Sequence, residues 1–206
     1  MSRRASWMVM AGAVALLLVW VSFAPAERTL GSGIRSVYLH VAASWSGLAG
    51  VYLAGLLGMV LAWRPTAGLE RWTRSVASIG IALFIVGFGL SLWSARVNWG
   101  GILLGEARVA ASFWIVVAGL FVRALTATAM PRRWKGLSWT LLAAFAAWSL
   151  STAELFFHPE RPFRSSEAMG IVLGLYGALA LTLVAGAMGV LLLATARPVE
   201  PEDQRE

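Results

Sequence analysis

The residues best suited to bind a ligand are two histidines, the only ones among the 206 residues of the chain. His40 stands in "SVYLHVAASW", just inside a long apolar segment, and His158 stands in "ELFFHPERPF", just beyond the end of another. A buried imidazole without a hydrogen-bond partner costs about 1–3 kcal/mol, so each ring needs a partner. A backbone carbonyl or a lipid headgroup would satisfy either ring alone. As a pair, two neutral imidazoles are also common axial ligands of haem iron.

Other kinds of chemistry fit the sequence poorly. Zinc needs three or four protein ligands, and neither histidine has a His or Cys cluster near it in the sequence. The chain has no cysteine, which excludes disulfides, a thiol relay and a thioether attachment of haem within this chain. It also has no Walker-type phosphate loop and no nucleophile elbow. We therefore expect a binding or transfer protein and not an enzyme.

The composition of the chain is typical of a polytopic membrane protein. Hydrophobic residues make up 59% of it, charged residues make up 13%, and the mean hydropathy is +0.73. Segments of about 20 mostly apolar residues, the length needed to cross the hydrocarbon layer, recur along it. They predict a single all-α domain, a bundle of six transmembrane helices near residues 7–23, 37–62, 76–93, 109–129, 136–153 and 168–194. We expect the acidic residues 197–206 to form a disordered tail.

The net charge of +7 comes from short basic clusters between the apolar segments, so we expect no nucleic-acid partner. With six spans, 11 of the 17 Lys and Arg residues fall on the side of the N-terminus and 6 on the other side. The positive-inside rule then predicts a multi-pass protein of the cell (inner) membrane with both termini in the cytoplasm. Loops near 24–36, 94–108 and 154–167 would face outward and carry both histidines. A cleaved signal peptide ending at the "APA" of residues 24–26 is the alternative for the first segment.

The loop expected between the third and fourth helices, in "WSARVNWGGILLGEARVAAS", contains an apolar run. Apolar residues in an exposed loop are unfavourable unless the loop lies on the membrane or covers a flat, apolar ligand. Both interpretations remain open on the residues alone.

Three segments together resemble a known family. The stretches "FAPAERTLGSGIRSVYLHVAASWS", "WGGILLGEAR" and "ELFFHPERPF" occur in this order, each at an expected outer loop. They resemble the CcmC haem-handling proteins of cytochrome c maturation and, more distantly, their CcsA relatives. The similarity covers most of the chain, from about residue 20 to about residue 190. It implies that His40 and His158 are the axial ligands of a haem b held at the outer, periplasmic face.

The resemblance also implies a role for the loop, which in this family carries the WWD motif, W-G-x-W-W-x-W-D-x-R. Trp99, Gly100 and Arg108 keep their places in the motif, and Glu106 stands where the family has Asp. Three expected tryptophans are replaced by Ile102, Leu103 and Gly105. Tryptophan offers a larger and more polarisable surface for stacking on a porphyrin than an aliphatic residue does, so this departure bears on haem binding.

The function implied by the resemblance is delivery of haem for cytochrome c assembly. The loop would lie against the edge of the haem, and nearby arginines would pair with its propionates. The arginines that qualify are Arg35, Arg96, Arg108, Arg161 and Arg164. The expected partners are membrane lipid, subunits of an ABC-type haem export and assembly complex, and a haem chaperone. The alternatives are a haem-free scaffold subunit of such a complex and a b-type cytochrome with a bis-histidine haem.

Overall fold

The computed structural model describes residues 2–102, 104–154 and 169–196, and these ranges are helical apart from short connections. The helices are α1 (Arg3–Phe23), α2 (Ile34–Trp63), α3 (Ala67–Trp99), α4 (Ala107–Leu125), α5 (Arg132–Thr152) and α6 (Met169–Ala194). The described ranges contain no strand, only an isolated β-bridge between Glu27 and Gly31. The predicted all-α fold is therefore confirmed. His158, Leu103 and the tail 197–206 lie outside the described residues.

Five of these six helices, all except α5, are long and apolar enough to cross a membrane. The chain therefore has the structure of a helical membrane protein. Helix α5 has 21 residues, but Arg132, Arg133 and Lys135 lie in its first turn and hydroxyl side chains follow along its length.

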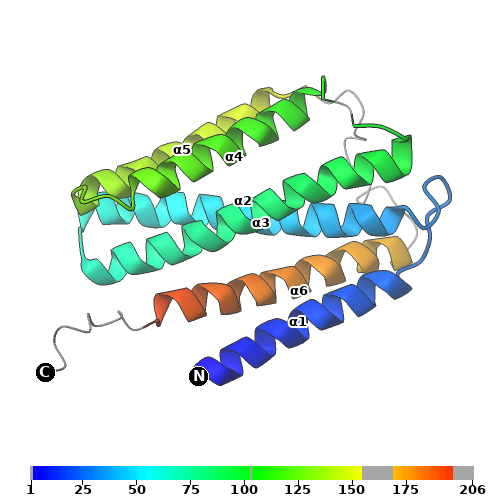
Figure 1. Cartoon of the computed structure of the whole chain (residues 1–206), viewed down its shortest axis with the longest axis horizontal. Coiled ribbons are helices and arrows are strands. Elements are labelled where there is room, and N and C mark those ends of the chain that lie inside the picture. The colour runs from blue at the N-terminus through cyan, green and yellow to red at the C-terminus, as the bar shows by residue number, and fades with distance from the viewer. Residues whose placement is uncertain (1, 103, 155–168, 197–206) are drawn as a thin grey trace, which may run out of the picture.

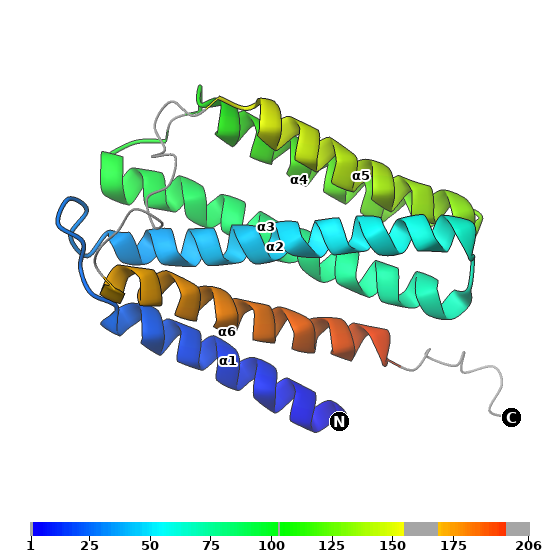
Figure 2. The ribbon, with the colours of Figure 1, turned by 180° about the vertical axis from the view of Figure 1, so that it is seen from behind.

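Helices α2 and α3 form the central layer of the bundle, with α4 and α5 on one side and α1 and α6 on the other (Figures 1 and 2). Successive helices run in opposite directions, so the connections alternate between the two ends of the bundle (Figure 1). We call the end with connections 24–33 and 100–106 the histidine end. The end with connections 64–66 and 126–131 is the basic end. The described basic residues thus separate between the two ends as the sequence predicts.

The ends of the helices follow from local sequence. The Ser2 hydroxyl accepts a hydrogen bond from the Ala5 N–H (3.2 Å), and the Thr66 hydroxyl accepts one from the Leu69 N–H (3.3 Å). Helix α3 ends at Trp99, and the Gly100 that caps it has a φ of 76°, in the left-handed region that glycine adopts readily.

Helix α3 is much longer than the apolar segment 76–93 on which its prediction rested. It begins at Ala67, nine residues before the predicted span, since hydropathy misses its first two turns. These turns contain charged residues, which favour a helix as well as apolar ones do. It continues to Trp99, so the expected loop over 94–108 is wrong for residues 94–99, and Ala107 and Arg108 already belong to α4. Helix α4 ends at Leu125, four residues before the predicted limit, and α2 begins at Ile34, inside the expected loop 24–36.

Close approach of α2 to its neighbours organises the core. A Cβ atom on Gly50 would lie 2.7 Å from the Cα of Gly80 in α3, and one on Gly47 would meet the backbone N of Phe84. On the side facing α5, a Cβ on Gly58 would lie 2.5 Å from the carbonyl oxygen of Gly136. Small residues at these contacts let the backbones touch, as is common between helices in membranes.

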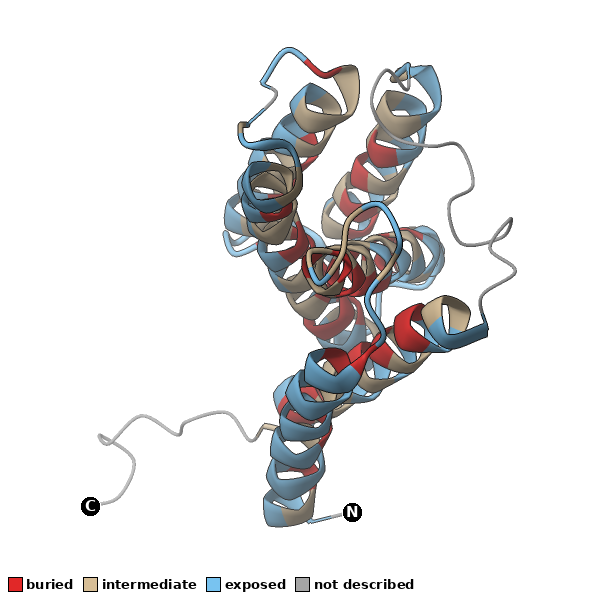
Figure 3. Ribbon diagram, turned by 90° about the vertical axis from the view of Figure 1, so that its right-hand side faces the viewer, coloured by how far each residue is buried: buried red, intermediate tan, exposed pale blue. Residues whose placement is uncertain are grey.

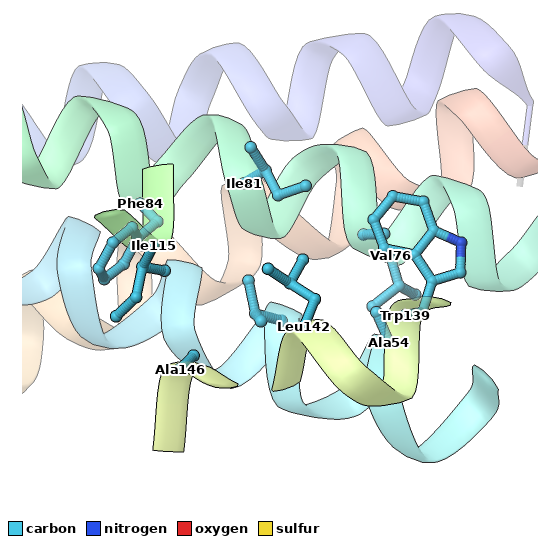
Figure 4. Packing of buried hydrophobic residues seen from close by; sticks show 10 residues of the cluster. Ala54, Val76, Ile81, Phe84, Ile115, Trp139, Leu142 and Ala146 are labelled. Carbon is cyan, nitrogen blue, oxygen red and sulfur yellow. The ribbon is translucent and has the colours of Figure 1, made fainter. Parts of the chain in front are cut away.

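Larger side chains fill the space around these contacts. Phe84, Ile115 and Ala146 lie toward one end of the cluster, and Trp139 of α5 and Val76 of α3 lie toward the other (Figure 4). Buried residues line the inward sides of the helices, and exposed residues cover the outside, as the view onto the histidine end shows (Figure 3). The exposed apolar surface is the face expected to contact lipid.

We predict that Gly47→Ala lowers the stability of the bundle by about 1–3 kcal/mol, because the added methyl group forces α2 away from the backbone of α3. Gly89→Ala is the matched control, since nothing lies within 4 Å of its added Cβ. Alanine is the better helix former, so the control should be neutral or more stable by up to about 1 kcal/mol. Thermal unfolding in detergent, followed by helicity, measures both. Equal destabilisation by the two changes would contradict the close crossing.

Candidate functional site

His40 lies on the second turn of α2 and faces α3. Its Nδ1 lies 3.0 Å from the carbonyl oxygen of Gly87 and 3.2 Å from the hydroxyl oxygen of Ser44. The side chain is half-buried. His40 is six residues beyond the first residue of α2, which places it about 9 Å inside the helix at a rise of about 1.5 Å per residue.

The contact with Gly87 assigns the tautomer of the imidazole. A carbonyl oxygen only accepts hydrogen bonds, so the proton must be on Nδ1, and the lone pair of the neutral ring is then on Nε2. Histidines that ligate metals commonly donate their other N–H to a backbone carbonyl in this way. The same bond is what a purely structural histidine needs. The geometry is therefore suited to ligation, and both interpretations of His40 predict it.

A second polar cluster joins α2 to α3 closer to the histidine end. The hydroxyl of Ser36 donates to the carbonyl of Gly33 (2.7 Å) and lies 2.9 Å from the hydroxyl of Ser94. The side-chain amide of Asn98 donates to the carbonyl of Ser94 (2.9 Å) and to the hydroxyl of Ser36 (3.1 Å). These bonds fix the start of α2 against the end of α3, and so fix the position from which His40 projects.

Gly87 and this polar cluster were not predicted from sequence, although the sequence contains a signal for both. Ser36, His40 and Ser44 follow at intervals of four residues, which places them on one face of α2. Gly80, Gly87 and Ser94 follow at intervals of seven residues on α3, which also share a face. Two matching stripes of small and polar residues indicate that the helices face each other there.

The connection between α3 and α4 exposes apolar side chains. Trp99 is the last residue of α3 and is 50% exposed, while Ile102 and Leu104 are 44% and 72% exposed. Gly100 and Gly105 add no side chain to this surface. Glu106, by contrast, is only 4% exposed and is the N-cap residue of α4, although its side chain makes no capping hydrogen bond.

The arginines at this end differ in their surroundings. Arg108, in the first turn of α4, is half-buried, and its buried Nε has no hydrogen-bond partner among the described residues. The Nε of Arg35 donates to the carbonyl oxygen of Ala24 (3.1 Å) and so holds the connection between α1 and α2. Arg96 is exposed. Arg161 and Arg164 lie outside the described residues.

The structure places His40 and the 99–106 connection at the same end of the bundle but at different depths. Gly87, the partner of His40, is twelve residues before Trp99 on α3, which corresponds to about 18 Å along the helix. Trp99, Gly100 and Glu106 thus belong to a rim at the end of the bundle, whereas His40 lies among the helices. A ligand bound to His40 could meet this rim only along an outer edge.

Among the described residues, no group of three or more His, Asp or Glu side chains could hold a bare metal ion. Iron within a porphyrin needs protein ligands only at its axial positions, so a haem remains compatible with this site. The chain matches no protein-family model and no curated protein.

The connection between α1 and α2 is shaped by Glu27. Its carboxylate accepts hydrogen bonds from the N–H groups of Leu30 and Thr29, both at 2.8 Å, and these bonds lower the pKa of Glu27. The N–H of Gly31 also donates to the carbonyl of Glu27 (2.8 Å), and Gly31 has a positive φ of 55°. The turn is therefore held by the ionised form of a single side chain.

We predict that this turn loosens in acid. Since the pKa of Glu27 is lowered in the folded chain, its contribution is present above the unfolded pKa and is lost as the pH falls through the folded value. Hydrogen exchange at Thr29 and Leu30, corrected for intrinsic rates, should show protection that decreases on acidification. Glu27→Gln should give weaker protection that does not change with pH. Protection that stays constant with pH in the unaltered chain would contradict this role of the carboxylate.

Proposed function

We propose that this chain is a haem-handling protein that holds haem b at one face of the cell membrane and presents it for cytochrome c assembly. Haem is its cargo, and no covalent step is assigned to the chain. The observation that carries the proposal is the bond between His40 Nδ1 and the Gly87 carbonyl, which keeps the Nε2 lone pair of a half-buried imidazole suited to iron. The resemblance of the three outer segments to CcmC proteins supplies the biological context.

Two further features support haem as the cargo. The buried Nε of Arg108 lacks a partner among the described residues, and a haem propionate would satisfy it with a charge-assisted hydrogen bond. The exposed rim formed by Trp99, Ile102 and Leu104 offers an apolar surface at the same end of the bundle. His158 is proposed as the second axial ligand, on the resemblance of its segment. Gly100 allows the rim to turn, and Glu106 is proposed to orient it without touching iron.

The proposal includes the sidedness of the membrane. All six helices cross it, α5 included, and the basic end faces the cytoplasm together with both termini, in line with the positive-inside rule. The histidine end then faces outward, where a haem chaperone can collect the cargo. Since the sequence has no Walker-type loop and no cysteine, energy input and haem attachment belong to partners such as an ABC-type complex and the chaperone.

A scaffold subunit without haem is the second candidate, and one observation favours it. The rim exposes Ile102 and Leu104 where the CcmC pattern has tryptophan or a neighbour of it, so the aromatic surface for a porphyrin is reduced to Trp99. Such a subunit would keep the bundle and its partner contacts but would carry no haem.

We predict that the purified chain, produced with ample haem, shows the absorption spectrum of six-coordinate, low-spin haem. His40→Gly and His158→Gly should each open one axial position, which added imidazole should refill. Ser44→Ala is the matched control for the site, because it leaves the bond between His40 and Gly87 in place and should keep the low-spin spectrum. Arg108→Ala should lower haem retention with little change in the spectrum. Haem bound normally after loss of both histidines would refute the ligand assignment, and absence of stoichiometric haem would favour the scaffold.

The orientation of the bundle in the membrane can be tested by labelling single introduced cysteines, since the chain has no cysteine of its own. Cysteine at the exposed position Ser32 should react with an impermeant thiol reagent from outside the cell, because it lies at the histidine end. Cysteine at Ala67 or Thr128, both exposed at the basic end, should react only after the membrane is opened. Since the ends alternate, a reversed pattern would place His40 on the cytoplasmic side and overturn delivery to an outer chaperone.

A further inference from the structure

The basic end of the bundle has more cations than its carboxylates can neutralise. Six basic residues lie on the first turns of α3, the last turn of α4 and the first turn of α5: Arg71, Arg74, Arg123, Arg132, Arg133 and Lys135. Glu70 is the one carboxylate on these turns, and it is already paired with Arg132 Nε and Lys135 Nζ, both at 2.8 Å. Within the described ranges, the remaining four arginines form no ion pair.

Of the four arginines without an ion pair, Arg123 is the one whose guanidinium is held by a hydrogen bond to a side chain of another helix. It is half-buried on α4, and its Nε donates a hydrogen bond to the hydroxyl of Ser78 on α3 (3.0 Å). A guanidinium has five N–H donors in a fixed plane, so this bond orients the plane while engaging only one of them. Arg71, Arg74 and Ser78 are spaced three and four residues apart on α3 and share one face. Arg71 and Arg74 therefore lie on the side of α3 that carries Ser78, the residue to which Arg123 bonds from α4.

Exposed apolar side chains and exposed tryptophans lie near these arginines. Leu120, one turn before Arg123 on the same side of α4, is 52% exposed. Trp72 and Trp134, on the terminal turns of α3 and α5, are 39% and 59% exposed, and exposed tryptophans are enriched at the level of lipid headgroups. Clustered positive charge next to exposed apolar surface matches a molecule with an anionic head and an acyl tail.

We propose that Arg71, Arg74 and Arg123 bind the phosphate group of an anionic phospholipid, whose acyl chains lie over Leu120. The phosphate would accept hydrogen bonds from several guanidinium groups, with the plane of Arg123 fixed by Ser78. An acidic protein segment would satisfy the charges but would leave the adjacent apolar surface of α4 uncovered. The site does not depend on haem binding, since it lies at the opposite end of the bundle from His40.

The test measures how tightly the full-length chain in detergent retains phosphatidylglycerol, compared with phosphatidylcholine of the same acyl chains, by native mass spectrometry. The chain should prefer phosphatidylglycerol. Arg74→Gln with Arg123→Gln should weaken that preference about 25-fold, or about fivefold for each charge removed. The matched control is Arg28→Gln with Arg96→Gln, which removes two exposed arginines at the histidine end and should leave the preference unchanged.

A charge-preserving variant, Arg74→Lys with Arg123→Lys, guards against a fold defect in the glutamine variant. It should be as helical as the unaltered chain and should keep most of the preference, because the positive charges remain. Equal retention of the two lipids by the unaltered chain would overturn the proposal, and so would equal losses in the basic-end and control variants. Displacement of the lipid by inorganic phosphate or polyglutamate at matching concentration would assign the site to a free anion or to an acidic protein segment instead.

Discussion

The close crossing of α2 and α3 is the contact on which the rest of the molecule depends. Where Gly50 meets Gly80, the backbones approach so closely that a single methyl group would overlap the facing helix. Further along the same seam, a Cβ on Gly87 would lie 2.5 Å from the backbone N of Ser44. In a membrane, helices gain little from hydrophobic association with one another, so van der Waals contact and hydrogen bonds between helices decide which faces meet. The crossing therefore fixes the register of α2 against α3.

That register determines the chemistry of His40. The imidazole reaches the Gly87 carbonyl because Gly87 has no side chain and α2 can approach it directly. In apolar surroundings an imidazole N–H without an acceptor is strongly unfavourable, so the bond selects one tautomer. The polar cluster around Ser36 then anchors the same two helices nearer the surface. The tautomer of His40, and with it the nitrogen that could bind a ligand, therefore follow from the packing of α2 against α3.

Much of the fold follows from sequence, because runs of apolar residues long enough to cross a membrane have few alternatives to the helix. The order of the six helices is predicted correctly for this reason. The ends of α3 are not predicted correctly. Hydropathy shows where an apolar run stops, but the helix continues past that point through charged residues such as Arg71 and Arg74. His40 could be singled out by its rarity. Its partner could not, because a backbone carbonyl has no side-chain signature, and only the spacing of Gly80, Gly87 and Ser94 hints at it.

Helix α4 carries polar contacts near both of its ends, one at the basic end of the bundle and one at the histidine end. Only Ile115 and Gly119 of this helix are buried, and its other contacts with the core come from partly buried side chains such as Val116 and Val122. Polar groups near its two ends add to these contacts: Arg123 bonds to Ser78 at one end, and the buried Glu106 and half-buried Arg108 stand at the other. Because a helix moves nearly as a rigid rod, a shift of α4 at the Ser78 contact would carry Arg108 with it relative to His40. The position of Arg108 at the histidine end therefore depends partly on an arginine contact at the basic end.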